Sequence, residues 1–154
     1  MKKLLFAFFL SLMFAPVWSQ TVEDIIELER AALKAEKRAI VDENMSLTKD
    51  EAQVFWPAYE EFDEAIHKLQ NERIAIIKDY AENYDKLDDV KAQELLNRSL
   101  KLRQDFVNME VKHFKKMMKI LSPNKTARFF QIHNKVNAIV NAEIALEIPL
   151  VETK

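Results

Sequence analysis

The residues best suited to chemistry in this sequence lie on one predicted helix. Met109, His113 and Met117 are spaced four residues apart, which places them along one face of a helix. Thioether sulfur and imidazole nitrogen are ligands for Cu(I) and similar soft metals. The same three positions fall on the apolar seam of that helix, where methionine is a common core residue. The spacing therefore indicates either a soft-metal site centred on His113 or ordinary core packing.

Two Glu-x-x-His pairs, Glu64 with His67 and Glu110 with His113, are a second candidate for metal chemistry. In helical bundles such pairs hold two iron ions together with a glutamate from each of two further helices. The two histidines differ by about six residues in their distance from the turn expected between their helices, an offset of about 9 Å. This offset argues against one shared site. The remaining histidine, His133, has no second ligand at helical spacing, and we expect it at the surface or boundary.

The composition excludes several classes of enzyme. The sequence contains no cysteine, so it has no thiolate chemistry and no disulfide. It contains no glycine, on which phosphate-binding loops, dinucleotide-binding turns and tight strand hairpins depend. It has neither a G-x-S-x-G nor an H-E-x-x-H motif. We therefore expect an all-α fold without enzymatic activity and without a cofactor.

The N-terminus is typical of an export signal. Lys2 and Lys3 precede an apolar stretch, Leu4–Ala15, which is shorter than the roughly 20 residues that span a bilayer. We predict that residues 1–19 are a signal peptide cleaved after Ser19, and that residues 20–154 form a single exported domain without stable membrane insertion. Without Lys2 and Lys3, 21 basic residues stand against 25 acidic ones, and this balance argues against binding to nucleic acid.

The hydrophobic pattern predicts four helices, over Val22–Asn44, Thr48–Lys86, Asp89–Leu121 and Pro123–Leu146. The second helix has an apolar seam with alternating steps of four and three residues, in which Arg73 is the one polar residue: Phe55, Tyr59, Phe62, Ile66, Leu69, Ile76 and Tyr80. The third helix has two apolar rows. The first is Leu95, Leu102, Phe106, Met109, His113, Met117 and Ile120, and the second is Leu96, Leu100, Val107, Val111, Phe114 and Met118. The fourth helix is expected to turn inward Phe129, Ile132, Val136, Ile139 and Val140.

Pro57 is the one break in these patterns. Proline removes a helical hydrogen bond and clashes with the carbonyl four residues back, so we expect a kink near residues 53–56 or a helix that restarts at Pro57. Trp56 either packs beside this kink or is an exposed anchor. The tail Ile148–Val151 is predicted to be an extended apolar strap.

The predicted helix lengths have a consequence for assembly. The second helix, as predicted, measures roughly 58 Å, whereas a compact domain of this size has a radius of gyration of about 14 Å. The second and third helices must therefore form a long hairpin. Because this hairpin is apolar on more than one face, we predict a homodimer in which the long helices cross or lie antiparallel.

Two short motifs in the chain match each other. Leu47-Thr48-x-x-Glu51 and Leu121-Ser122-x-x-Lys125 both place a hydroxyl residue at a helix N-cap, after a leucine and three residues before a long polar side chain. Thr48 and Glu51 are predicted to form a capping box, and Pro123 occupies the first position of its helix. Together with the export signal and the predicted hairpin, these motifs resemble the LTxxQ motifs of the Spy/CpxP family. The fifth motif position, typically glutamine in that family, is Glu51 and Lys125 here.

The resemblance implies a bent helical hairpin that dimerises into a cradle in the periplasm. It further implies ATP-independent binding of unfolded proteins, or regulation of a stress sensor by binding it. The candidate binding surface consists of basic residues beside Phe114 and Met118, namely Lys112, Lys115, Lys116, Lys119, Lys125 and Arg128. These cations are alternatively an ordinary solvated face near the end of a helix. Some members of the family sense metals, so a metal-sensing module remains an alternative, as does a structural interaction protein.

Overall fold

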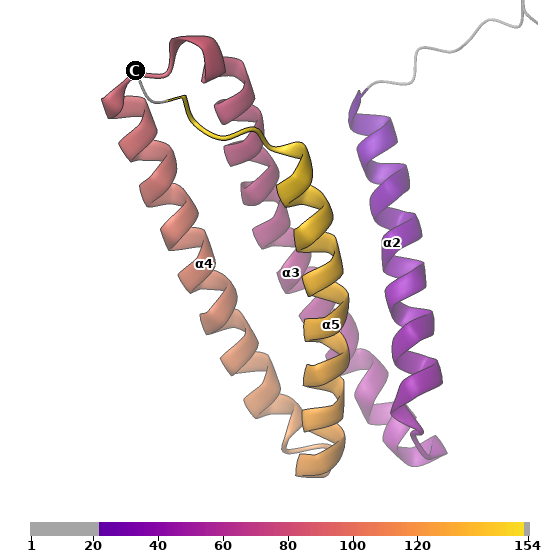
Figure 1. Cartoon of the computed structure of the whole chain (residues 1–154). Coiled ribbons are helices and arrows are strands. Elements are labelled where there is room, and N and C mark those ends of the chain that lie inside the picture. The colour runs from indigo at the N-terminus through magenta and orange to yellow at the C-terminus, as the bar shows by residue number, and fades with distance from the viewer. Residues whose placement is uncertain (1–21, 153–154) are drawn as a thin grey trace, which may run out of the picture. The chain divides into compact units, whose positions relative to one another are not determined.

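The computed structural model describes residues 22–152, with side chains from residue 31 onward, and the predicted signal peptide lies outside this range. Within it the chain is all-helical and has no strand (Figure 1). The elements are α2 (Val22–Met45), α3 (Lys49–Asn83), the short 3₁₀ helix η2 (Tyr84–Lys86), α4 (Asp89–Met117) and α5 (Pro123–Glu147). The four predicted helices are thus confirmed. Residues up to Ala39 and residues from Ile40 onward are separate units, and the packing described below belongs to the second.

The predicted helix starts are confirmed by their capping bonds. Thr48 Oγ1 accepts from the Glu51 amide at 3.3 Å, and Glu51 Oε2 accepts from the Thr48 amide at 2.8 Å, which completes the capping box. At the start of α5, Ser122 Oγ accepts from the Lys125 amide at 3.3 Å, with Pro123 at the first helical position. The matching motifs are therefore both helix starts.

Helix α3 continues through Pro57, so the alternative of a helix that restarts there is wrong. Pro57 is exposed, whereas Phe55, Ala58 and Tyr59 around it are buried. Burial on the opposite side of the helix holds both flanking segments against the core, and this packing offsets the missing hydrogen bond.

Helix α4 ends at Met117, four residues before the predicted Leu121. The last turn tightens because the amides of Lys119 and Ile120 donate to the carbonyls three residues back, at 3.1 and 3.0 Å. Leu121 is buried, so the tightened turn brings this motif leucine onto the core.

The main core is a cluster of aromatic rings from α3 and α5. Phe129 packs edge-to-face on Phe55 and Phe62, with ring centroids 5.4 and 5.6 Å apart, and all three rings are fully buried. The remaining buried members of this cluster come from α2, α3, α4 and the connection that follows α4: Val41, Met45, Tyr59, Ile66, Met117 and Leu121. The predicted seams of α3 and α4 are thus the buried faces. The prediction was wrong for Ile139, which is 62% exposed.

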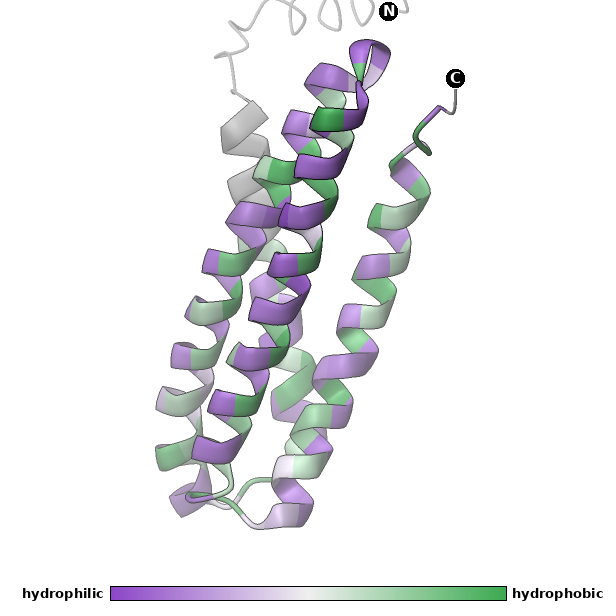
Figure 2. Ribbon diagram, turned by 90° about the vertical axis from the view of Figure 1, so that its left-hand side faces the viewer, coloured by the Kyte–Doolittle hydropathy of each residue, from purple (hydrophilic) through white to green (hydrophobic). Residues whose placement is uncertain are grey.

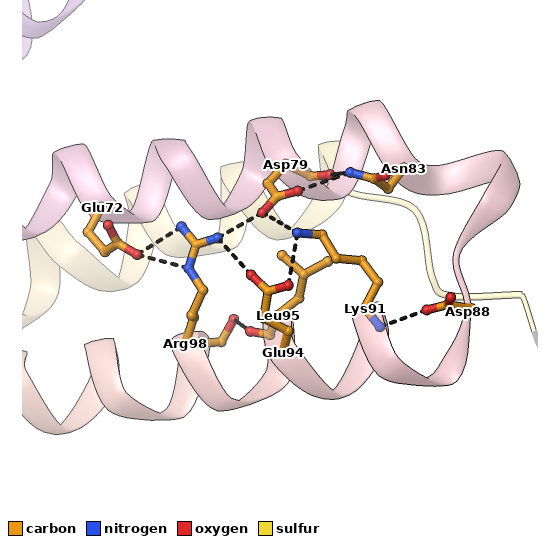
Figure 3. A network of polar contacts seen from close by, with 9 residues as sticks. Glu72, Asp79, Asn83, Asp88, Lys91, Glu94, Leu95 and Arg98 are labelled. Carbon is orange, nitrogen blue, oxygen red and sulfur yellow. Dashed lines mark hydrogen bonds and ion pairs between the residues drawn. The ribbon is translucent and has the colours of Figure 1, made fainter.

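Farther along the α3–α4 pair, a smaller core of Ile76, Leu95 and Leu102 is bordered by an ionic network. Figure 3 shows Asp79 of α3 between Lys91 and Arg98 of α4, each at 2.8 Å, and the guanidinium of Arg98 also binds Glu72 at 3.0 Å. Hydrogen bonding from Lys91 is the main cause that lowers the pKa of Asp79. The network fixes which turns of the two antiparallel helices face each other.

Helix α5 starts beside the end of α4 and runs back along the α3–α4 pair (Figures 1 and 2). Arg73 Nη1 donates to Asn141 Oδ1 at 2.7 Å and joins α3 to α5. After α5, the chain extends across to α3, where the hydroxyls of Tyr80 and Tyr84 donate to the carbonyls of Pro149 and Leu150 at 3.0 and 3.2 Å. This extended segment agrees with the predicted strap.

Figure 2 also shows hydrophobic and hydrophilic residues interspersed along α3, α4 and α5. No helix within the described part of the chain is both long enough and apolar enough to cross a membrane.

Candidate functional site

The two sequence motifs, 74 residues apart, meet in the folded unit. The ammonium of Lys125 forms an ion pair with Glu51 and donates to the Ser46 carbonyl at 3.2 Å. The hydrogen bond from Lys125 is the main cause that lowers the pKa of Glu51. Leu121 is buried, and Leu47 packs against the same core. The motif residues therefore act first as a clamp between the starts of α3 and α5.

This clamp engages some of the predicted basic binding residues. Arg128 donates from Nε to the Asn44 carbonyl, so it and Lys125 hold the α2–α3 connection. Lys116 forms an ion pair with Glu61 of α3. Three predicted cations are exposed: Lys112 and Lys115 on α4, and Lys119 just after its end. These three are the part of the predicted set that remains available to a partner.

The second apolar row of α4 is exposed. Leu96, Leu100, Val107, Val111 and Met118, which we call the α4 stripe, each expose between 48% and 58% of their surface. At 3.6 residues per turn the four members within the helix, Leu96, Leu100, Val107 and Val111, fall within an arc of about 60°, and Met118 is the residue that caps the helix end. Lys112 and Lys115 fall within the next 100° of the helix circumference, on the side away from the core. Helix α4 therefore presents an apolar and a basic strip side by side.

The two predicted apolar members of the binding surface differ in burial. Met118 belongs to the α4 stripe, whereas Phe114 is half-buried against Phe62 and Phe129, with centroids 5.4 and 5.6 Å apart. Phe130 of α5 packs edge-to-face on Phe114 at 4.9 Å and is 40% exposed. Phe114, which belongs to the same predicted apolar row as the α4 stripe, thus packs on the aromatic core.

The candidate metal ligands lie on the buried face of α4. Met117 is fully buried in the aromatic cluster, and His113 is buried with its ring 5.6 Å from that of Phe62. Burial is also the main cause that lowers the pKa of His113. Among the residues described, no three His, Cys, Asp or Glu side chains gather into a cluster that could hold a metal ion. Met109, which is half-buried, borders the same core.

His133, which we expected at the surface or boundary, is in fact buried. His133 is 8% exposed and packs edge-to-face on Phe62 at 4.9 Å. Its Nε2 lies 3.1 Å from Glu110 Oε1 and 2.7 Å from the amide of Asn137. Burial raises the pKa of Glu110. The i,i+4 spacing of His133 and Asn137 was the sequence signal for this polar group, but its partner on α4 could not be inferred from spacing.

Trp56 packs on the core and is not an exposed anchor. It is half-buried, and its ring lies 5.1 Å from Phe55 and 5.4 Å from Tyr59.

Comparison with known protein families, with curated proteins and with solved structures finds no match to this chain. A functional assignment therefore depends on the surfaces described above and on the resemblance carried by the two motifs.

Proposed function

We propose that this protein is an exported, ATP-independent binding protein for unfolded or partner proteins, as its resemblance to the Spy/CpxP family implies. The observation that carries the proposal is the α4 stripe. Exposed apolar residues that form a continuous strip mark sites of protein interaction more often than isolated ones do. Unfolded chains expose apolar side chains that such a strip can cover.

The basic strip beside the α4 stripe supports the same function. Lys112, Lys115 and Lys119 add a long-range attraction for acidic segments, and this attraction weakens with salt because the Debye length shortens from about 10 Å at 0.1 M to about 3 Å at 1 M. Charge would therefore speed the encounter, and apolar contact would retain the client.

The test is suppression of light scattering from insulin, which precipitates when its disulfides are reduced. Because the protein has no cysteine, the reductant acts on the client alone. Without ATP and metal, we expect suppression at near-stoichiometric ratios. The variant with Leu96→Gln, Leu100→Gln, Val107→Thr and Val111→Thr should lose most of this suppression.

The control removes the same number of exposed apolar side chains outside the α4 stripe, which expose between 46% and 85% of their surface: Val54→Thr, Val90→Thr, Ile139→Thr and Leu146→Gln. It should suppress scattering as the unmodified protein does. Equal activity of both variants would contradict the role of the α4 stripe. A triple lysine-to-glutamate change at residues 112, 115 and 119 should weaken suppression at low salt and have little effect at 1 M salt.

The proposal includes a periplasmic location and a homodimer of bent hairpins with antiparallel long helices. Sedimentation at micromolar concentration tests the dimer, and a strictly monomeric protein would contradict it. If the four-residue variant of the α4 stripe also became monomeric, the stripe would be the dimer interface, and the client assignment would be wrong.

A metal-sensing function is the second candidate, because Met109, His113 and Met117 do share one face of α4. A soft metal would have to enter beside the aromatic core, since Met117 is fully buried there. Calorimetric titration with Cu(I) tests this alternative. Stoichiometric binding that His113→Ala abolishes would support it.

A further inference from the structure

A half-open cavity lies between α3, α4 and α5 and shares only Val107 with the α4 stripe. Its volume is about 590 Å³, within the range of about 300–1,000 Å³ that is usual for small-molecule sites. Its walls are mainly apolar, from Ile66, Ile76 and Ile77 of α3 and from Leu102 and Phe106 of α4. Such walls favour a ligand with an apolar body.

The polar groups of this cavity favour an anion. Arg73 and Arg103 both line it, and neither forms an ion pair with any described carboxylate. Arg73 is half-buried, and its one hydrogen bond goes to the neutral amide of Asn141. A guanidinium has five N–H donors in a planar fork that matches a carboxylate, so several of its donors remain for a ligand.

The acidic side chains do not cancel this charge. Among the described residues that line the cavity, Glu110 is the only carboxylate, and it is already in contact with His133 at 3.1 Å. Burial raises the pKa of Glu110. Two guanidinium groups therefore face one engaged carboxyl group, and the wall is positive overall.

The length of the cavity indicates the size of an apolar ligand. Its α3 wall extends from Ile66 to Ile77, about 16 Å at 1.5 Å per residue. A single alkyl chain of about a dozen carbons, at roughly 1.25 Å per carbon, has a comparable length.

We propose that this cavity binds a single-chain fatty acid, with the carboxylate on the guanidinium of Arg73 and the alkyl chain along Ile76 and Ile77. The strap borders this end of the cavity, because Ile148 lines it and the hydroxyls of Tyr80 and Tyr84 hold the next two carbonyls. Ile77 and Ile148 also line a second apolar cavity of about 430 Å³. Arg73 precedes Ile77 by four residues, about 6 Å, so the chain end beyond Ile77 would enter that second cavity.

The test is calorimetric titration of the purified protein with laurate and with dodecanol, which have the same chain and differ in charge. We expect saturable one-to-one binding of laurate that is at least tenfold tighter than binding of dodecanol. Arg73→Met should weaken laurate binding at least tenfold and leave dodecanol binding within twofold. Lys112→Met removes one exposed cation outside the cavity and is the matched control, with no change expected.

Two further measurements keep the proposal testable if Arg73→Met does not fold. Arg73→Lys retains the charge without the planar fork and should give an intermediate affinity. Ile77→Trp should abolish binding of both ligands by filling the cavity. Absent binding of laurate, equal affinity for laurate and dodecanol, or tighter binding of an acidic leucine-rich hexapeptide would each overturn the proposal. Client suppression does not involve Arg73, so Arg73→Met should preserve it, and failure of either proposal is distinguishable from failure of the other.

Discussion

Two adjacent phenylalanines on α5 should differ sharply in their contribution to stability. Phe129 is 1% exposed. Its ring centroid lies within 5.9 Å of the ring centroids of four aromatic neighbours: Phe55, Tyr59, Phe62 and Phe114. Replacing a buried phenylalanine by alanine typically costs about 3–5 kcal/mol, because apolar burial is lost and a cavity remains. We expect Phe129→Ala to lower the free energy of unfolding by about 4 kcal/mol.

Phe130→Ala is the matched control, because it makes the same chemical change one residue along the same helix. Phe130 is 40% exposed and has one edge-to-face ring contact, with Phe114 at 4.9 Å. Losing such a contact costs about 0.5–1.5 kcal/mol. The helix propensities of both variants change equally, so the difference of about 3 kcal/mol between them reports burial alone.

Urea unfolding followed by circular dichroism measures this difference. With an m-value of about 2 kcal/mol per molar, Phe129→Ala should lower the midpoint by about 2 M and Phe130→Ala by about 0.5 M. Equal shifts for the two variants, or a cost below about 1.5 kcal/mol for Phe129→Ala, would refute the arrangement of the aromatic core. Because Phe130→Ala should remain folded, its client suppression can be measured directly, and we expect that suppression to be reduced.

Three further predictions concern a helix cap and two titrating groups. Thr48→Ala should cost about 1 kcal/mol in urea unfolding, because it removes the N-cap acceptor of α3, whereas Thr48→Ser should cost little. The pKa of Asp79 is lowered below 3.8 in the folded protein, so the stabilisation it gives is complete above pH 3.8 and is lost as the pH falls through the folded-state pKa. Asp79→Asn should therefore remove this part of the acid dependence of the urea midpoint. An acid dependence that Asp79→Asn leaves unchanged would contradict the ion pair with Lys91. The pKa of His113 is lowered below 6.5 by burial, so the unfolded chain binds the proton more tightly and the stability should fall as the pH drops below about 6.5. A urea midpoint that does not change between pH 7.5 and 5.5, or that changes equally in His113→Leu, would count against the burial of His113.

Local features of the sequence determined the helices and their starts. The apolar period and the two capping motifs involve residues close together in the chain, so they predicted α3 and α5 together with the N-caps Thr48 and Ser122. The absence of glycine also predicted an all-helical fold, which the described residues have. The end of α4 was misplaced because its tightened last turn follows from the packing of Leu121 on the core.

Tertiary structure decided which of these local features form surfaces. The two apolar rows of α4 have the same helical period, so periodicity alone could not tell that the row with Leu102 is buried and the row with Leu100 is exposed. Long-range contacts also brought Lys125 to Glu51 and His133 to Glu110, which sequence spacing cannot predict. The α4 stripe and the cavity beside Arg73 both result from where α3 and α5 pack. The physical reason is that a helix forms from contacts within a few residues, whereas burial depends on which distant helix covers each face.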